Sequence, residues 1–364
     1  MSNPYRGLPD SAFWSRAVAW VPPGGLDPML AAPHVSRGQP VATMGSCFAQ
    51  HISRHLQGLG LDYMVTEAAP PGLPPAEAST HNYGVFTARF GNVYTVRQAL
   101  QLAQRAFGLF TPAEDAWPTL PGAPAEGWVD AFRPQIQPHP LPSPEAVRAA
   151  TAEHLAAVRT MFQGARWLVF TLGLTEAWRS RIDGAVNPVA PGVAAGAFDP
   201  SRHEFVNFTQ AEVDADLEAL IQGLKELNPG CGVILTVSPV PLIATYEPRH
   251  VLVSTTVSKA ILRVAADAAE RRHDHVTYFP SYEIINSAHH EGRYWADDLR
   301  QVNELGVGHA MRVFSRHFLG MDGMLPTSAA PAGGAAASPG PMAEVVCDEE
   351  VIEAALRNAG FTPG

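Results

Sequence analysis

The sequence predicts an α/β fold, a three-layer α/β/α sandwich built on a mainly parallel sheet. Short apolar runs of strand length alternate along the chain with longer segments that have helical periodicity. Parallel strands need crossover connections, and helices on both faces of the sheet provide them. A chain of 364 residues, 46% hydrophobic and 16% charged, has the length and the composition to bury such a core.

The first strand is expected from Pro40 to Met44, followed by a tight turn and a helix whose apolar face carries Phe48, Ile52 and Leu56. Thr95 is suited to cap the next helix. Residues 183–208 are expected to form a loop or a β-hairpin excursion. Further strands are expected at 167–172, 233–237 and 275–279, and further helices at 95–108, 144–163, 211–227, 254–272 and 303–318.

Proline and glycine content divides the chain into segments. Residues 1–37 are expected to form an extended N-terminal lead-in and residues 38–320 the folded domain, with a proline-rich insertion near 109–144. Residues 321–346 are rich in Ala, Pro, Gly and Ser, a composition that predicts a disordered linker. Residues 347–364 are predicted to form a short amphipathic helix. Its apolar face consists of Val351, Ile352, Ala355 and Leu356.

Charge and cysteine content exclude several classes of protein. The formal net charge of -10 leaves no excess of cations for a phosphate backbone, so no nucleic-acid partner is expected. The three cysteines are widely spaced and argue against a disulfide framework and a structural zinc site. The N-terminus has no apolar run typical of a secretory signal, and no segment has the length of a membrane span. We therefore expect a cytoplasmic protein without a membrane partner, a cofactor or a catalytic metal.

Ligands of parallel α/β sheets bind where the strands end. The turn Gly45-Ser46-Cys47 presents a thiol at the start of a helix, where backbone N–H groups and the helix dipole activate a thiol and form an oxyanion site. The alternative is structural, with Cys47 as a small buried residue and Ser46 as a helix cap. Polar or turn-forming residues also follow the later strands, at 173–176, 238–241 and 294–303.

Gly45-Ser46-Cys47-Phe48-Ala49 spells the signature of the GSCFA family, and the chain resembles this family at further collinear motifs. These motifs are the segments 90–95, 171–178, 236–241, 258–259 and 278–283. The resemblance covers roughly residues 38–318. It implies an SGNH-hydrolase-like protein, because GSCFA proteins look like divergent relatives of those esterases and acyl-transfer enzymes, which have the three-layer α/β/α fold.

The resemblance also implies roles for individual residues. Cys47 matches the nucleophile of the Gly-Asp-Ser block, and Ser46 stands at the usual aspartate. Gly91 matches the glycine of the second block, so its amide and the amide of Cys47 would form the oxyanion hole. Thr175 stands where the third block has asparagine, and Glu176 occupies the acidic position after it.

The last block of that pattern, Asp-x-x-His, is matched by Asp298 but has Gln301 at the histidine. A glutamine has no titratable group and cannot act as a general base. A thiol depends less on such a base than a hydroxyl does. A histidine from elsewhere is the alternative, and the candidates are His290, His289, His81 and His51.

Other residues have both a functional and a structural interpretation. Lys259 resembles the base of a Ser-Lys pair, but an exposed helix face is the commoner place for such a lysine. Arg293 and Arg300 are expected to pair with Asp297 and Asp298 in preference to an anionic substrate. Four aromatic residues are expected in the core or in a platform for a sugar ring: Tyr94, Trp178, Tyr282 and Trp295.

Two functional hypotheses follow. The first is an SGNH-like esterase or acyltransferase that uses Cys47 and acts on an O-acyl group, with a small-molecule or glycan acyl ester as its substrate. The second is a catalytically degenerate SGNH-fold protein that binds a glycan or a protein partner. Gln301 favours the second hypothesis, and so does the apolar face of the C-terminal helix, which is suited to dock in a groove.

Overall fold

The computed structural model describes residues 3–321 and 350–352. The chain forms two compact units, which are described in turn. Of the described residues, 3–36 and 279–321 belong to the helical unit, and 37–278 and 350–352 belong to the sheet unit.

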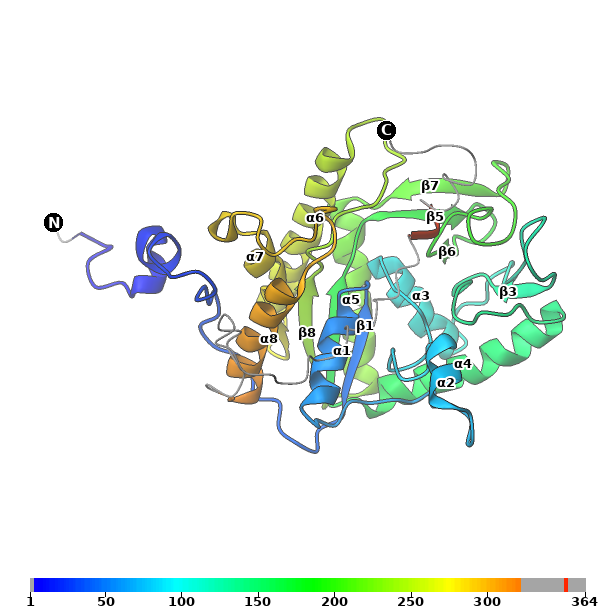
Figure 1. Cartoon of the computed structure of the whole chain (residues 1–364), viewed down its shortest axis with the longest axis horizontal. Coiled ribbons are helices and arrows are strands. Elements are labelled where there is room, and N and C mark those ends of the chain that lie inside the picture. Colours follow the sequence, from blue (N-terminus) through cyan, green and yellow to red (C-terminus); the bar gives the residue numbers. More distant parts are fainter. Residues whose placement is uncertain (1–2, 322–349, 353–364) are drawn as a thin grey trace, which may run out of the picture. The chain divides into compact units, whose positions relative to one another are not determined.

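The sheet unit is built on a four-stranded parallel sheet with the strand order β1-β4-β8-β9 (Figure 1). Its strands are β1 (Val41–Gly45), β4 (Trp167–Leu172), β8 (Gly232–Val237) and β9 (Val276–Tyr278). Every residue of β1, β4 and β8 is buried, as expected for continuous apolar strands covered by helices. The predicted α/β class and parallel sheet are confirmed.

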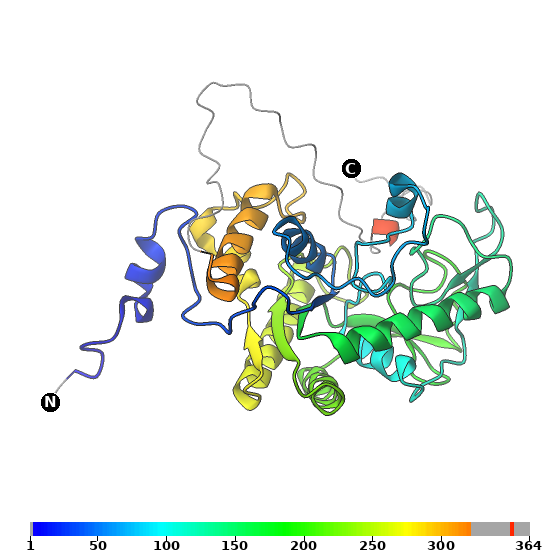
Figure 2. The ribbon, with the colours of Figure 1, turned by 90° about the horizontal axis from the view of Figure 1, so that it is seen from below.

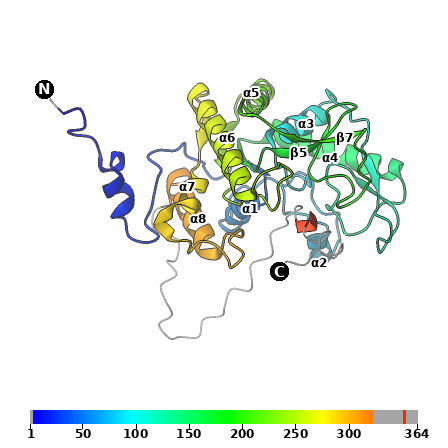
Figure 3. The same ribbon diagram turned by 90° about the horizontal axis from the view of Figure 1, so that it is seen from above.

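Helices flank this sheet: α1 packs on β1, and α6 packs on β8 and β9. Figure 3 shows α5 and α6 side by side, and α3 and α4 (cyan and green in Figure 2) also lie against each other. The helices of this unit are α1 (Ala49–Gly58), α2 (Pro75–Thr80), α3 (Val96–Ala106), α4 (Pro144–Gly164), α5 (Gln210–Leu227) and α6 (Val251–Arg272).

Side-chain caps determine where several of these helices begin. Thr95 and Gln98 form a capping box at the start of α3, which confirms the predicted cap. The Ser143 hydroxyl accepts a hydrogen bond from the amide of Ala146 at the start of α4. α6 begins before its predicted start at 254, because the His250 ring accepts a hydrogen bond from an amide of its first turn.

Two antiparallel sheets complete the sheet unit. The excursion predicted at 183–208 contributes β6 and β7, which pair on either side of β5 in the order β6-β5-β7, and the proline-rich insertion forms the pair β2-β3. The strands are β2 (Ala116–Pro118), β3 (Trp128–Asp130), β5 (Glu176–Ser180), β6 (Val186–Asn187) and β7 (His203–Asn207). Trp117 and Ala131 of the insertion pack against Ala195 of the excursion in a small apolar core.

In the helical unit, α8 (Glu304–Leu319) holds the N-terminal segment. The amide of Val35 donates a hydrogen bond to the Phe318 carbonyl over 2.7 Å, and the His309 ring bonds the Leu26 carbonyl over 2.7 Å. The segment predicted as an extended lead-in is thus tied to α8, and it contains two short helical turns. The remaining elements are η1 (Asp10–Ala12), η2 (Ser15–Ala19), α7 (Ser281–Asn286) and η3 (Ala288–His290).

Within the described residues, no helix has the length and hydropathy needed to cross a membrane. The linker predicted at 321–346 and the helix predicted at 347–364 lie outside the described residues, apart from Met321 and residues 350–352. Residues 350–352, red in Figure 1, are helical and half-buried.

Candidate functional site

The turn after β1 lies in close contact with the end of β4. Gly45 has a φ of +135°, and a Cβ atom at this position would lie 2.2 Å from the carbonyl oxygen of Thr171. The next amide, that of Ser46, donates a hydrogen bond to the same oxygen over 3.1 Å. Only glycine fits this backbone conformation and this approach, so the sequence fixes a sharp turn immediately before Cys47.

Cys47 lies in a single tight turn that leads into α1. The Ala49 amide donates to the Ser46 carbonyl over 2.8 Å, and the Gln50 amide donates to the Cys47 carbonyl over 3.1 Å. Cys47 is 6% exposed and Ser46 is 3% exposed. No side chain caps α1, so the alternative that Ser46 is its cap is wrong. The Ser46 hydroxyl is buried without a hydrogen-bond partner in the described part of the chain, a condition that a functional group or a bound molecule commonly explains.

The segment that contains Gly91 connects the ends of β1 and β4. The Val93 amide donates to the Gly45 carbonyl over 2.8 Å. The Tyr94 carbonyl accepts from the amides of Gly173 and Leu174, both over 3.0 Å. The turn at Gly45-Ser46-Cys47, the segment that contains Gly91 and residues 173–174, separated widely in sequence, therefore meet at the carboxyl edge of the sheet.

Thr175 is buried, and both its amide and its hydroxyl form hydrogen bonds. Its amide donates to the Ser258 hydroxyl over 3.0 Å, and its own hydroxyl lies 2.7 Å from the Asn207 side-chain oxygen and 3.1 Å from the Ser258 hydroxyl. A hydroxyl has one proton to donate. To serve as an oxyanion donor, the Thr175 hydroxyl would have to give up the bond to Asn207.

Lys259 corrects one expectation. The sequence favoured an exposed helix face for this residue, but its side chain on α6 is buried, and its ammonium donates a hydrogen bond to the Gly173 carbonyl over 2.6 Å. Lys259 is buried because its partner, Gly173, lies against the turn before Cys47. A Cβ atom added to Gly173 would lie 3.1 Å from the Ser46 Cβ. A long cationic side chain thus supports the turn that faces Ser46.

Glu176 borders an apolar pocket of about 290 Å³. Its carboxylate accepts hydrogen bonds from the Thr245 hydroxyl over 2.6 Å and from the Tyr246 amide over 3.2 Å. Burial raises the pKa of Glu176 and outweighs these hydrogen bonds. Trp178 lines the same pocket in edge contact with Tyr246 at a ring separation of 5.0 Å, and Ile352 of the C-terminal segment lines it as well.

The last predicted block lies in the helical unit. The Asp298 carboxylate is exposed and accepts the amides of Arg300 and Gln301, both over 2.9 Å, which closes a tight loop. Gln301 is exposed. Arg293 pairs with Glu291 over 2.8 Å and not with the predicted Asp297 or Asp298.

The candidate histidines occupy separate environments. In the helical unit, His290 is buried, stacks on Tyr294 at 3.8 Å and bonds the Ile284 carbonyl. His289 of the same unit bonds the Val21 carbonyl over 2.7 Å. In the sheet unit, His51 lies against Phe48, and burial, aided by the Arg54 charge, lowers the pKa of His51 to about 4. The fourth candidate, His81, stacks on Tyr83 at 6.4 Å.

The remaining aromatic candidates differ in burial: Tyr94 is buried, whereas Tyr282 and Trp295 are half-buried. Only Trp178 among the four lines the pocket beside Glu176.

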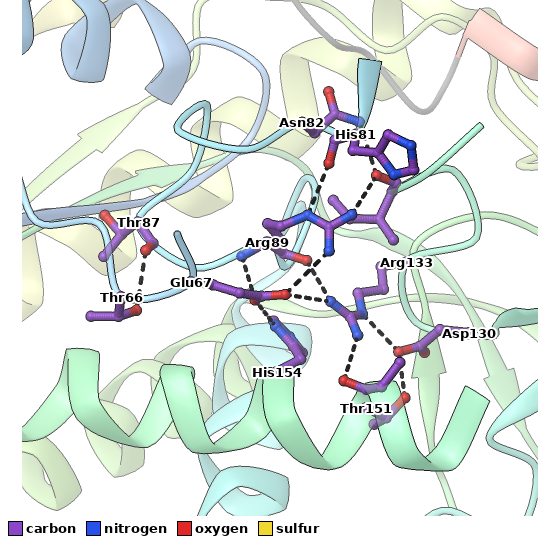
Figure 4. Close-up of polar contacts among 12 residues, drawn as sticks. Thr66, Glu67, His81, Asn82, Thr87, Arg89, Asp130, Arg133, Thr151 and His154 are labelled. Carbon is purple, nitrogen blue, oxygen red and sulfur yellow. Dashed lines mark hydrogen bonds and ion pairs between the residues drawn. The ribbon is translucent and has the colours of Figure 1, made fainter. Parts of the chain in front are cut away.

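The sheet unit contains a buried cluster of charged side chains that was not predicted from the sequence. Glu67 contacts Arg89 at 3.4 Å, Arg133 at 3.3 Å and His154 at 2.7 Å, and Asp130 contacts Arg133 at 2.8 Å (Figure 4). Arg89 directly precedes the segment that contains Gly91. The only local pattern in this cluster is the spacing of Asp130 and Arg133; the other members come from separate parts of the chain. In residues 3–321 and 350–352, no three His, Cys, Asp or Glu side chains are grouped closely enough to hold a metal ion.

The geometry defines an α/β protein with a candidate thiol site at the carboxyl edge of a parallel sheet. The GSCFA family model matches residues 40–314, and the chain therefore belongs to the GSCFA family. No similar protein was found among curated sequences.

Proposed function

We propose that the protein is an SGNH-like esterase or acyltransferase that acts on O-acyl groups, such as those of carbohydrates, with Cys47 as nucleophile. The main support is the convergence of Gly45-Ser46-Cys47, the Gly91 segment and the segment 173–176 at one edge of the sheet. An SGNH-like three-layer architecture is part of the same proposal, supported by the parallel sheet and by a nucleophile turn that follows its first strand.

The reaction would proceed in two steps. The Cys47 thiolate attacks the acyl carbonyl, the ester C–O bond breaks, and the alcohol leaves with the proton that the thiol gave up. The amides of Cys47 and Gly91 would stabilise the oxyanion; among the described residues none accepts a hydrogen bond from the Gly91 amide. Water or an acceptor hydroxyl then attacks the thioester and restores the thiol.

Other residues would assist this chemistry. Thr175 and Glu176 lie at the end of β4, where Thr175 would complete the oxyanion site and Glu176 would contact the substrate in the adjoining pocket. The apolar and aromatic lining of that pocket, which includes Trp178, suits an acyl chain or the C–H face of a sugar ring. Asp298 keeps the acidic position of the last block in this proposal. Gln301 stands at the histidine of that block, so His290 is only the alternative source of an imidazole.

Hydrolysis of p-nitrophenyl acetate tests this proposal. We expect Cys47→Ala to abolish turnover and Cys47→Ser to reduce it at least about a hundredfold, since a serine needs a base that Gln301 cannot supply. The matched control is Cys231→Ala, which removes the other described cysteine, at the opposite end of the sheet before β8. Wild-type activity in Cys47→Ala would eliminate the covalent mechanism.

A second candidate function is the binding of an apolar helix or glycan without catalysis, and one observation favours it. Ile352, on the predicted apolar face of the C-terminal segment, lines the pocket beside Glu176. The pocket therefore accommodates a branched aliphatic side chain presented by a helix. Adding a peptide of residues 347–360 to a chain that lacks residues 346–364 should quench or shift the Trp178 fluorescence; Trp178→Phe is the control. An unchanged spectrum would count against this function.

A further inference from the structure

The buried cluster of Figure 4 has an imbalance of charge. Both carboxylates of the cluster already have hydrogen-bond partners. Glu67 is bonded to Arg89, Arg133 and His154. Asp130 is bonded to Arg133 and to the Thr151 hydroxyl. His154 adds no positive charge at neutral pH, because burial and the Arg133 charge lower its pKa to about 4 against the opposing bond from Glu67.

A third buried arginine lies beside this cluster. The Arg105 side chain projects from α3, is 7% exposed, and stacks over the Phe132 ring at 3.8 Å. No acceptor in residues 3–321 or 350–352 lies within hydrogen-bond distance of its guanidinium. Asp130, which lines the same cavity, and Asp115 both attract Arg105 electrostatically, but Asp130 is bonded to Arg133 over 2.8 Å and Asp115 to Arg148 over 3.0 Å. Three buried guanidiniums thus face two carboxylates.

Arg105 faces a small cavity of about 30 Å³. Gln98, two turns earlier on α3, also lines this cavity; its oxygen accepts hydrogen bonds from the amides of Tyr94 and Thr95 over 3.1 Å and 2.9 Å. The N–H groups of the Gln98 amide have no acceptor in the described part of the chain. The cavity therefore offers a forked cation and amide donors, while its volume is that of a few atoms.

We propose that this cavity is a binding site for a carboxylate group, held by the guanidinium of Arg105. A planar carboxylate matches the fork of a guanidinium bidentately, and it supplies the negative charge that the cluster lacks. Val93 lines the same cavity and donates its amide to Gly45, so the site adjoins the turn that carries Cys47. For a carboxylate carried by the substrate, the assignment rests on the proposed acyl-transfer function.

Thermal unfolding in acetate tests the site without reference to catalysis. At constant ionic strength, acetate should raise the unfolding midpoint saturably, and neutral acetamide of the same shape should not. Arg105→Met should weaken acetate binding about tenfold or more, and Arg105→Lys, which keeps the charge without the fork, should bind weakly. The control is Arg97→Met on the same helix, since Arg97 is bonded to Asp216 over 2.7 Å. Equal acetate effects in wild type and Arg105→Met, or none in wild type, would overturn the assignment.

Ester kinetics then identify the source of the carboxylate. If it belongs to the substrate, Arg105→Met should lower kcat/KM for p-nitrophenyl hemisuccinate about tenfold and leave that for p-nitrophenyl acetate unchanged. If the site holds a free small carboxylate, both esters should respond alike while acetate binding is still lost in the variant. A wild type that hydrolyses neither ester but binds acetate through Arg105 would contradict the proposed function and leave the carboxylate site standing.

Discussion

The ammonium group of Lys259 donates a hydrogen bond to the carbonyl oxygen of Gly173 over 2.6 Å, inside the sheet unit, with the lysine only 2% exposed. Gly173 follows β4, its amide donates to Tyr94, and its Cα faces Ser46. A buried ammonium is retained only where its surroundings compensate for lost hydration. Lys259 therefore holds the segment after β4 against the turn that carries Cys47.

Replacing Lys259 by methionine should lower the free energy of unfolding by about 2 kcal/mol, because the buried Gly173 carbonyl loses a charged donor. Urea unfolding measures this change. The chain has one other lysine, Lys225, which is half-buried on α5, and Lys225→Met should change stability by less than about 0.5 kcal/mol. Equal effects of the two substitutions would show that the bond to Gly173 contributes little.

Gly45→Ala should destabilise the protein by about 3 kcal/mol or more, since the added methyl group overlaps the Thr171 carbonyl and φ is strongly positive. Gly223→Ala is the matched control. Gly223 lies within α5, a Cβ there meets no atom within 4 Å, and this substitution should stabilise the helix by about 0.5 to 1 kcal/mol. Thermal unfolding compares the two, and a tolerated Gly45→Ala would contradict the close approach of β1 and β4.

Stability should fall as the pH drops from 6.5 to 4. The pKa of buried His154 is about 4 in the folded protein and 6.5 in an unfolded chain, so the unfolded state takes up the proton first. The contribution, on the order of 2 kcal/mol, is complete above pH 6.5 and lost towards pH 4. His154→Gln should flatten the dependence of unfolding free energy on pH.

Exposed His139, replaced by glutamine, should leave that dependence unchanged. A residual slope is expected in His154→Gln, because the pKa values of His51 and His309 are also lowered to about 4, chiefly by burial. The same slope in wild type and His154→Gln would show that the ring is not kept neutral by its surroundings.

The two described cysteines should differ in reactivity towards iodoacetamide. Burial raises the pKa of Cys231 to about 11, so its thiolate is scarce near neutral pH and we expect no alkylation. Cys47, in its turn before α1, should react at pH 6 faster than glutathione does. Intact-mass measurements on a Cys347→Ser variant follow the alkylation of Cys47 and Cys231. A Cys47 no faster than glutathione would favour the binding function over acyl transfer.

Strand and helix positions were largely predictable from the sequence. Trp167–Leu172 is a continuous apolar run that ends at Gly173, and it forms β4 with those bounds. The start of α3 at Thr95 was predictable, because the two residues of its capping box lie within four consecutive positions. Residues 183–208 were predicted as a loop or hairpin, and they contain β6 and β7. The strand between these two in the sheet, β5, was not predicted, because its pairing on both sides is encoded by no local pattern.

The surroundings of the candidate site were less predictable. The meeting of the Gly45 and Gly173 segments followed from the rule that strand ends share an edge, whereas the place of Gly91 beside them followed only from the family resemblance. The burial of Lys259 depends on one distant carbonyl, and the position of Arg105 beside Glu67 and Asp130 depends on three separate segments. Long-range contacts of this kind leave no periodicity in the chain.

The pairing of β1 with β4 brings Val41 opposite Trp167. During synthesis from the N-terminus, the ribosome releases β1 long before β4 has been translated. A nascent chain that stalls in this interval carries the cysteine but lacks the strand against which its turn is shaped. The turn that carries Cys47 is therefore completed late in translation, and partial products cannot present this cysteine in its final surroundings.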